Sequence, residues 1–158
     1  MEQHNKSQKT ALSIVSDFNA EELAVLWRSF DRFVVQDAPL PCPSKCFLST
    51  AQDGRFTING KKVFFSYQLA AYAAFGFGRL SDVPAKKIDE DSLVISHICG
   101  NGPLCCNPTH LELEPKRIND ERTHCHFVIN QILQNSGRDE ARRLKSKICF
   151  HVPKCCSL

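Results

Sequence analysis

The residues with the clearest capacity for chemistry are cysteines and histidines, which gather in two short segments of the chain. The two patterns are Cys99-x5-Cys105-x4-His110 and Cys149-x-His151-x3-Cys155. Thiolate and imidazole are ligands that tetrahedral Zn²⁺ accepts in structural sites. Each segment therefore predicts three ligands of a zinc site, and each site needs a fourth ligand from elsewhere.

The fourth ligands are sought among the cysteines outside these segments. Cys125, on a predicted helix just upstream, is the natural fourth ligand of the second site, while Cys42 and Cys46 both remain candidates for the first. Cys106 and Cys156 adjoin predicted ligands, and we expect them to be bystanders or alternates. The competing interpretation of any single cysteine is a small buried apolar side chain. That interpretation does not explain two separate three-ligand segments.

The composition supports zinc over disulfide bonds. The chain has 158 residues, with nine cysteines and six histidines, and an apolar fraction of 42% that fits one soluble globular domain. In a secreted protein the cysteines would suggest disulfides, but the polar segment 1–10 has no apolar signal region. No apolar stretch is long enough for a bilayer. An intracellular chain with interleaved cysteine and histidine favours zinc.

The N-terminal part predicts a polar tail followed by one amphipathic helix. Asn19 and Glu22 have the spacing of a capping box. Apolar residues then recur at helical spacing up to a proline-rich connector at 39–44, which predicts a helix ending before Pro39. Those apolar positions are Leu23, Leu26, Trp27, Phe30 and Val34.

The middle of the chain predicts a hairpin and a short helix. Residues 55–58 and 61–65 flank Asn59-Gly60, the dipeptide that a type I′ turn favours. The alanine-rich segment 68–75 predicts a short helix closed by Gly76. Residues 77–91 have a loop-like composition.

The C-terminal part must position the cysteine and histidine segments. A strand at 92–98 delivers His97 at its end, a loop spans 99–110, and a second short strand covers 111–113. Pro115 then favours a helix start. Asn135 to Gly137 ends that helix, and a short basic helix follows it.

These residues together resemble the His-Cys box of intron-encoded homing endonucleases, the region often called their zinc-binding loop. The resemblance covers about residues 46–155. Its motifs are Ser96-His97-Ile98-Cys99, Cys105 with Asn107-Pro108-x-His110-Leu111, Asn119-x2-Arg122-x2-Cys125, the closing Cys149-x-His151-x3-Cys155, and upstream Cys46-x-Leu48 with the hairpin Gly54-Arg55-x-x-Ile58 and Gly60-Lys61-Lys62-Val63.

The resemblance implies a metal-dependent DNA endonuclease with a ββα-metal (His-Me finger) site. His97 would be the general base that activates water, since imidazole titrates near neutral pH. Asn119 would bind one catalytic Mg²⁺ through its amide oxygen. A cation on the hairpin, with Lys61 slightly favoured over Arg55 and Lys62, would stabilise the cleaved phosphate. All three also are candidates for contacts to the DNA backbone.

The expected architecture is an α+β, zinc-stapled ββα-metal domain at residues 41–158, preceded by a tail and helix at 1–40. Two structural zinc ions would supply part of its folding free energy. The partner would be double-stranded DNA, and we expect no membrane partner. The protein would act in the nucleus or in an intracellular compartment with access to it. A homodimer fits the resemblance, but not one held by a C-terminal arm, since the printed sequence stops three residues after Cys155.

The sequence departs from the family pattern at Ser66, Tyr67 and Gln68, where many relatives have histidine or arginine. The net charge of +3 permits a polyanionic partner without demanding one. Two other functions therefore stay open: a catalytically silent zinc-stabilised module that binds nucleic acid or protein, and a purely structural double-zinc domain. The sequence leaves open the target site, the choice of DNA or RNA and the oligomeric state.

Overall fold

The computed structural model describes residues 18–29, 33–36, 42, 45–50, 55–56, 64–84 and 89–155. In chain order the elements are α2 (Ala20–Ser29), β1 (Phe33–Gln36), β2 (Cys46–Ser49), β3 (Arg55–Phe56), β4 (Phe64–Phe65), α3 (Ser66–Leu80), β5 (Leu93–His97), the 3₁₀ turn η2 (Pro108–His110), β6 (Leu111–Pro115) and α4 (Lys116–Ile148). The strands pair antiparallel as β1–β2, β3–β4 and β5–β6, which confirms the predicted α+β class.

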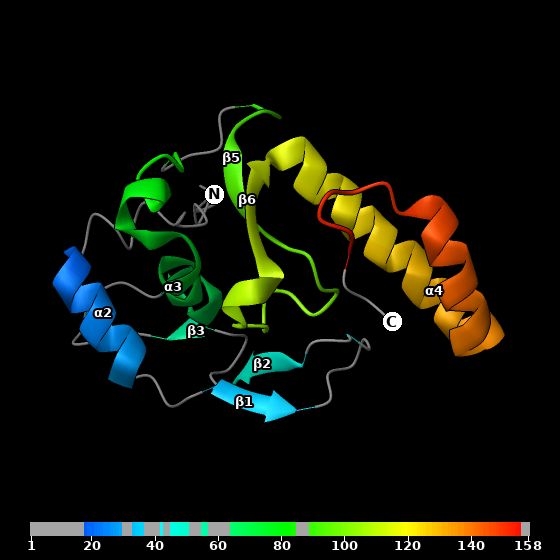
Figure 1. The fold of residues 1–158 in the computed structure, drawn as a ribbon, viewed down its shortest axis with the longest axis horizontal. Coiled ribbons are helices and arrows are strands. Elements are labelled where there is room, and N and C mark those ends of the chain that lie inside the picture. The colour runs from blue at the N-terminus through cyan, green and yellow to red at the C-terminus, as the bar shows by residue number, and fades with distance from the viewer. Residues whose placement is uncertain are drawn as a thin grey trace, which may run out of the picture.

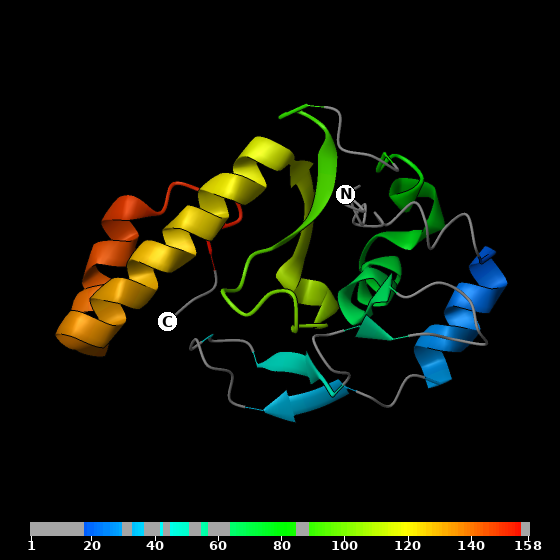
Figure 2. The ribbon, with the colours of Figure 1, turned by 180° about the vertical axis from the view of Figure 1, so that it is seen from behind.

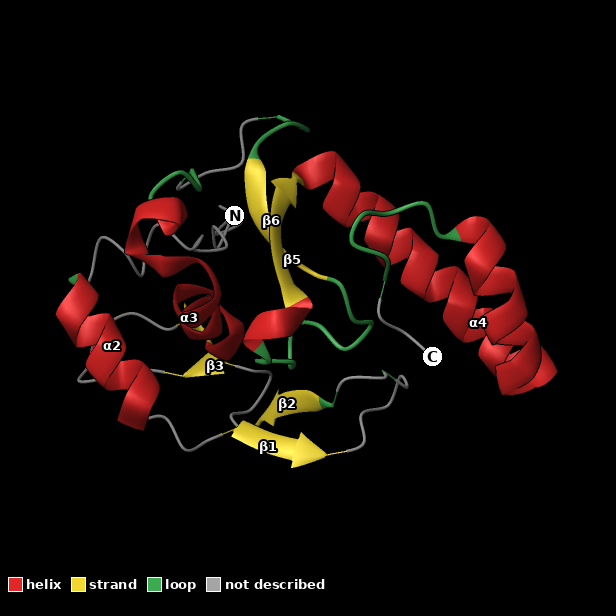
Figure 3. Cartoon of the chain, viewed as in Figure 1, coloured by secondary structure: helices red, strands yellow, loops and turns green. Residues whose placement is uncertain are grey.

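The β5–β6 hairpin stands between the two helical parts of the molecule, with α2 and α3 on one side and α4 on the other (Figure 3). The hairpin pairs His97 with Leu111, and α4 starts directly after β6. None of the helices in the described ranges combines the length and the apolarity needed to span a bilayer.

Helix α2 begins with the predicted capping box. The amide of Asn19 donates to a Glu22 carboxylate oxygen at 2.9 Å, and the amide of Glu22 donates back to Asn19 Oδ1 at 2.9 Å. Leu23 is fully buried and packs with Leu69 of α3. The helix ends at Ser29, so the prediction that it includes Val34 was wrong.

Val34 lies on β1, which pairs with β2 in a hairpin that the sequence analysis missed. Phe33-Val34-Val35 continues the apolar spacing of α2, but β-branched residues favour a strand when a partner is available. The partner is β2, where Val34 is opposite Leu48. Strand β2 also joins the loop before η2: the amide of Cys106 donates to the Phe47 carbonyl at 2.6 Å.

The predicted hairpin is present as β3–β4, where Arg55 pairs with Phe65. Its turn residues Asn59 and Gly60 lie outside the described residues. The following helix starts at Ser66, two residues earlier than predicted, and Gly76 (φ 75°) interrupts it as the sequence indicated. A further helical segment follows up to Leu80, so the prediction of a loop from residue 77 was wrong there.

Helix α4 carries two helical segments separated by Gly137 (φ 81°), where the sequence predicted the break. Pro115 lies at its N-cap position. After Gly137 the chain turns back, and the second segment runs beside the first (Figures 1 and 2). Cys125 and Ile129 of the first segment pack with Cys149, which directly follows the second.

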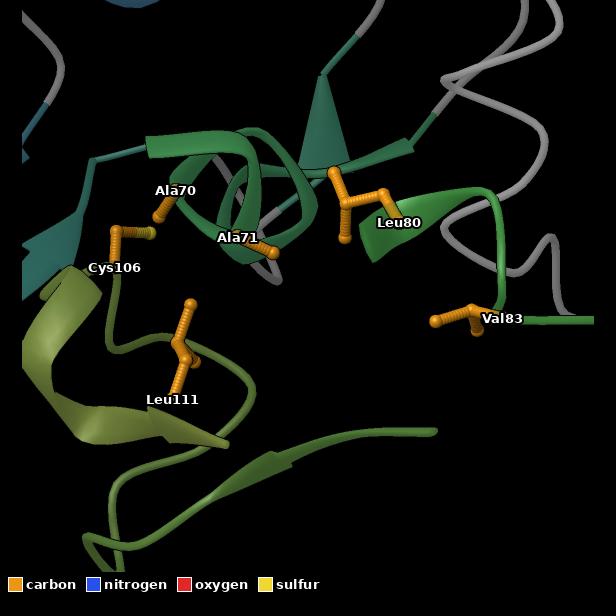
Figure 4. Close-up of a cluster of buried hydrophobic side chains, with 6 residues drawn as sticks. All are labelled: Ala70, Ala71, Leu80, Val83, Cys106 and Leu111. Carbon is orange, nitrogen blue, oxygen red and sulfur yellow. The ribbon is translucent and has the colours of Figure 1, made fainter. Parts of the chain in front are cut away.

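The apolar core beside the hairpin is small. Figure 4 shows Cys106 and Leu111 facing Ala70 and Ala71 of α3, with Leu80 and Val83 at one end of the cluster. All six residues are buried. The small alanine side chains let α3 approach the loop before η2, which holds the cysteine and histidine segment in place.

Candidate active site and zinc-binding clusters

The first cysteine and histidine segment closes into a buried four-ligand cluster with Cys46. The ligand atoms of Cys46, Cys99, Cys105 and His110 all lie within 4.8 Å of one another. His110 Nδ1 is 3.6 Å from Cys46 Sγ and 3.4 Å from Cys105 Sγ. A tetrahedral site with Zn–S near 2.3 Å and Zn–N near 2.0 Å has S···N edges of about 3.5 Å. The cluster therefore fits zinc.

Cys42, the other candidate, lies outside this cluster. Its Sγ is 3.8 Å from His110 Nε2, the nitrogen that points away from the three thiols of the cluster. Asn101 is a second neighbour that the sequence analysis missed, and its side-chain amide donates to Cys46 Sγ at 3.5 Å. Partners of this kind orient metal ligands and raise their affinity for the metal.

Asn107 fixes the turn that carries His110. Its side-chain oxygen accepts from the Thr109 amide at 3.0 Å, which caps η2, and its amide nitrogen donates to the Lys45 carbonyl at 2.8 Å. One asparagine thus joins the ends of two segments that are distant in sequence. The Asn-Pro pair in the motif has this structural role.

The second cluster unites the four predicted residues Cys125, Cys149, His151 and Cys155, whose ligand atoms also lie within 4.8 Å of one another. His151 Nδ1 is 3.6 Å from Cys149 Sγ and 3.4 Å from Cys155 Sγ. These distances again match the edges of a zinc tetrahedron. Cys156 lies outside the described residues.

The thiols of the second cluster differ in acidity. Burial raises the pKa of Cys155, and a hydrogen bond from Arg122 opposes that rise. Burial also tends to raise the pKa of Cys149, but hydrogen bonds from Cys155 and His151 outweigh this effect and lower the pKa to about 6. Cys149 is thus readily available as a thiolate, the form that binds zinc.

His97 ends β5, and three neighbours restrict its ring. Its Nε2 lies 2.9 Å from the backbone carbonyl oxygen of Cys105. A carbonyl only accepts, so Nε2 carries the proton and Nδ1 keeps the lone pair. Tyr67 packs edge-on against the ring, with centroids 4.9 Å apart. Gly102 lies so close that a Cβ there would be 2.8 Å from His97 Nδ1.

Burial keeps the side chains of both His97 and Tyr67 uncharged. Burial lowers the pKa of His97 to about 4, although the hydrogen bond to the Cys105 carbonyl acts in the other direction. Burial raises the pKa of Tyr67 to about 12. At neutral pH His97 is therefore an uncharged imidazole able to accept a proton, and Tyr67 is an uncharged phenol.

A pocket of about 400 Å³ brings His97 together with Asn119. Asn119 lies on the first turn of α4 and is half-buried, and its amide nitrogen makes a long contact of 3.5 Å to Asp120 Oδ1. The same face of α4 contributes Thr123, His126, Phe127 and Asn130 to the pocket. An amide oxygen beside an imidazole offers one hard ligand and one base, which suits Mg²⁺-assisted hydrolysis.

His126 is a pocket residue that the sequence analysis missed. Both of its ring nitrogens are buried, and neither makes a hydrogen bond in the described part of the chain. Burial lowers its pKa to about 4, and the nearby His97 backbone acts in the opposite direction. The spacing Asn119, Thr123, His126, Asn130 repeats along one helical face and could have identified it.

Only one of the three hairpin cations lies among the described residues. Arg55 begins β3, while Lys61 and Lys62 lie outside the described residues. Their proposed contacts to phosphate and DNA therefore remain predictions from the sequence.

Two Cys₃His clusters around a strand–loop–strand–helix frame define a zinc-stapled His-Me finger domain. A family model for the zinc-binding loop region of homing endonuclease matches residues 43–158, which include all eight cluster residues, His97 and Asn119. The chain belongs to this family, which confirms the resemblance to the His-Cys box enzymes. Searches of curated proteins and of solved structures gave no significant match.

Proposed function

We propose that this protein is a Mg²⁺-dependent endonuclease that hydrolyses phosphodiester bonds in double-stranded DNA. The family gives a nuclease-like scaffold. The observation that carries the proposal is the hydrogen bond of His97 Nε2 to the Cys105 carbonyl, which directs the lone pair to Nδ1 in the pocket shared with Asn119.

In the proposed reaction His97 is the general base. Its Nδ1 takes a proton from a water molecule as the water oxygen forms a bond to phosphorus; the P–O ester bond on the opposite side breaks, and the leaving oxygen takes up a proton from solvent. The Cys105 carbonyl then stabilises the protonated ring through the Nε2–H bond. Tyr67 and Gly102 restrict the orientation of the ring throughout.

Asn119 would hold the catalytic Mg²⁺ through its side-chain oxygen. The ion, when bound, would offset the negative charge that develops on the phosphate and the leaving oxygen. One neutral protein ligand suits Mg²⁺, which retains most of its water and also binds substrate phosphate. The β3–β4 hairpin, through Arg55, Lys61 and Lys62, would contact the DNA backbone, and Lys61 would assist at the cleaved phosphate.

We propose that the protein acts on DNA in the nucleus, or from an intracellular compartment with access to the nucleus. The test is cleavage of supercoiled plasmid with Mg²⁺ by the wild-type protein and by His97→Ala, with two zinc ions per chain verified in both. We expect nicking or linearisation by wild type and a rate about 10²–10⁴-fold lower for His97→Ala. The choice between DNA and RNA is tested by comparing cleavage of a linear DNA duplex with cleavage of an RNA duplex of the same length and sequence.

The competing function is a catalytically silent binding module on the same scaffold. If wild type binds the plasmid in a mobility shift at low salt but leaves it intact, the nuclease proposal fails in favour of that module. If the protein shows no salt-dependent binding at all, a purely structural double-zinc domain is the better description.

A further inference from the structure

Arg122 is the largest fully buried side chain among the described residues, and it pairs with a buried carboxylate. It lies on the first part of α4 and is 1% exposed, while the Glu114 side chain on β6 is 7% exposed. Arg122 Nε donates to Glu114 Oε1 at 2.7 Å, and Nη2 donates to Oε2 at 3.0 Å. Two parallel hydrogen bonds of this kind fix the guanidinium plane.

The third arm of the guanidinium reaches the second zinc-binding cluster. Arg122 Nη1 donates to the Pro153 carbonyl at 2.7 Å and to Cys155 Sγ at 3.7 Å. Pro153 lies in the loop between His151 and Cys155, two residues of that cluster. One side chain thus connects β6, α4 and the metal-binding loop.

The net charge of the second zinc-binding cluster makes a hydrogen-bond donor favourable there. A Zn²⁺ ion held by three thiolates and one neutral imidazole has a net charge of −1. The cluster is largely buried, and a buried negative charge needs hydrogen-bond donors or a counter-charge. Arg122 provides a charged hydrogen-bond donor to the Cys155 sulfur, and its pairing with Glu114 keeps the guanidinium in place.

Arg122 and its partner Glu114 are each connected to one residue of the proposed active site. Arg122 follows Asn119 by three residues on α4, which is about one helical turn. Glu114 pairs with Val94 on β5, the strand that ends at His97. A shift of the metal-binding loop would therefore be transmitted through the Arg122 guanidinium to the helix and the hairpin that form the pocket.

We propose that Arg122 is an outer-sphere partner of the second zinc site and a positioning residue that links zinc binding there to the placement of Asn119 against His97. The role of Arg122 in zinc binding does not depend on the proposed nuclease function. Its role in positioning Asn119 rests on that function. The role differs from that of a metal ligand, because the guanidinium has no lone pair to offer the ion.

The first experiment measures cadmium and zinc binding to the full chain. In the ¹¹³Cd-loaded wild type we expect two NMR signals, assigned through couplings to the Hβ protons of their own cysteine ligands. Arg122→Met, which keeps the length of the side chain without its donors, should move the second-site signal alone. Competition with a chromophoric chelator should show about 10–100-fold weaker zinc binding at the second site. The first site is the internal control.

A double variant separates this role from simple bracing of the fold. Arg122→Met alone leaves Glu114 as an unpaired buried carboxylate, whereas Arg122→Met/Glu114→Met replaces the whole ion pair by apolar side chains, a change that proteins often tolerate. If Arg122 acts only as a brace, the folded double variant regains wild-type zinc affinity at the second site, and the proposal is overturned. If the folded double variant still binds zinc more weakly than wild type at the second site alone, the proposal is supported.

The positioning half is tested with the zinc-saturated double variant. We expect kcat for plasmid cleavage to fall at least tenfold, with plasmid affinity and both zinc ions retained. Arg122→Lys, which keeps the charge without the forked geometry, should recover zinc affinity more than kcat. Wild-type kcat in the saturated double variant would refute the positioning role. A wild-type protein that never cleaves DNA would instead refute the proposed nuclease, and the zinc measurements would still decide the outer-sphere role.

Discussion

The His97 imidazole is tied through Nε2 to the backbone carbonyl of Cys105, 2.9 Å away, and the side chain of Cys105 belongs to the first zinc-binding cluster. The proposed base is therefore anchored to the loop that the metal would order. Loss of the ion would free both the Cys105 backbone and the ring that depends on it. Zinc at this cluster would in this sense support the proposed active site, although it would not contact the substrate.

Removal of zinc should unfold the domain and not merely inactivate it. Eight buried or half-buried ligands form the two clusters, and without an ion nothing would hold the segments that carry them together. We expect metal-free protein to lose most of its helical circular dichroism and to recover it with Zn²⁺ but not with Mg²⁺. A folded spectrum in protein shown by atomic emission to lack zinc would contradict the structural role.

The structure also predicts which cysteine completes the first site. Cys46 Sγ faces His110 Nδ1 inside the cluster, whereas Cys42 Sγ faces the outer nitrogen, Nε2. Cys46→Ser should therefore lower the zinc content from two ions per chain to about one, and Cys42→Ser should leave it at two with weaker affinity. Equal losses in both variants would mean that either cysteine can bind the ion.

Gly102 offers a test of the orientation of His97. A methyl group there would approach Cγ and Nδ1 of the ring to 2.8 Å, closer than real contacts allow. Gly102→Ala should turn the imidazole and lower the cleavage rate about 10–100-fold, since small misplacements of reacting groups have effects of this size. Two zinc ions and the folded spectrum should persist.

The matched control is Gly78→Ala, because a Cβ at that glycine meets no atom within 4 Å. We expect wild-type rates from this variant. If Gly102→Ala cleaves as fast as Gly78→Ala, then the orientation of the His97 ring does not limit the reaction, and the proposed role of the close contact is wrong.

Local signals account for what the sequence predicted well. The capping box at Asn19 and Glu22 and the break at Gly137 each depend on a few neighbouring residues, so they could be identified without the fold. The spacing of the cysteines and histidines also identified the two clusters, since few residue types can bind zinc.

Non-local pairing accounts for what the sequence could not show. Val34 was assigned to a helix because only its pairing with Leu48 makes it a strand residue. The same hairpin brings Cys46 to the cluster, which decided between Cys46 and Cys42. His126 shares one helical face with Asn119, but that this face lines the pocket depends on how α4 packs against β5, and this packing is not a local property of the sequence.

Asn119 is the residue whose substitution best separates DNA binding from hydrolysis. It lies in the pocket with His97, and among the described residues its side chain makes only the long contact to its neighbour Asp120; the hydrogen bond that it accepts from Thr123 is to its backbone carbonyl, which a substitution keeps. Asn119→Ala should therefore fold normally, bind DNA with unchanged salt dependence and lose most cleavage. Asn119→Asp, which offers a charged oxygen ligand, should shift the Mg²⁺ titration to lower concentration. Asn135→Ala, an exposed position beyond the pocket, is the control and should behave as wild type. Full cleavage by Asn119→Ala at every Mg²⁺ concentration would show that the catalytic metal is bound elsewhere.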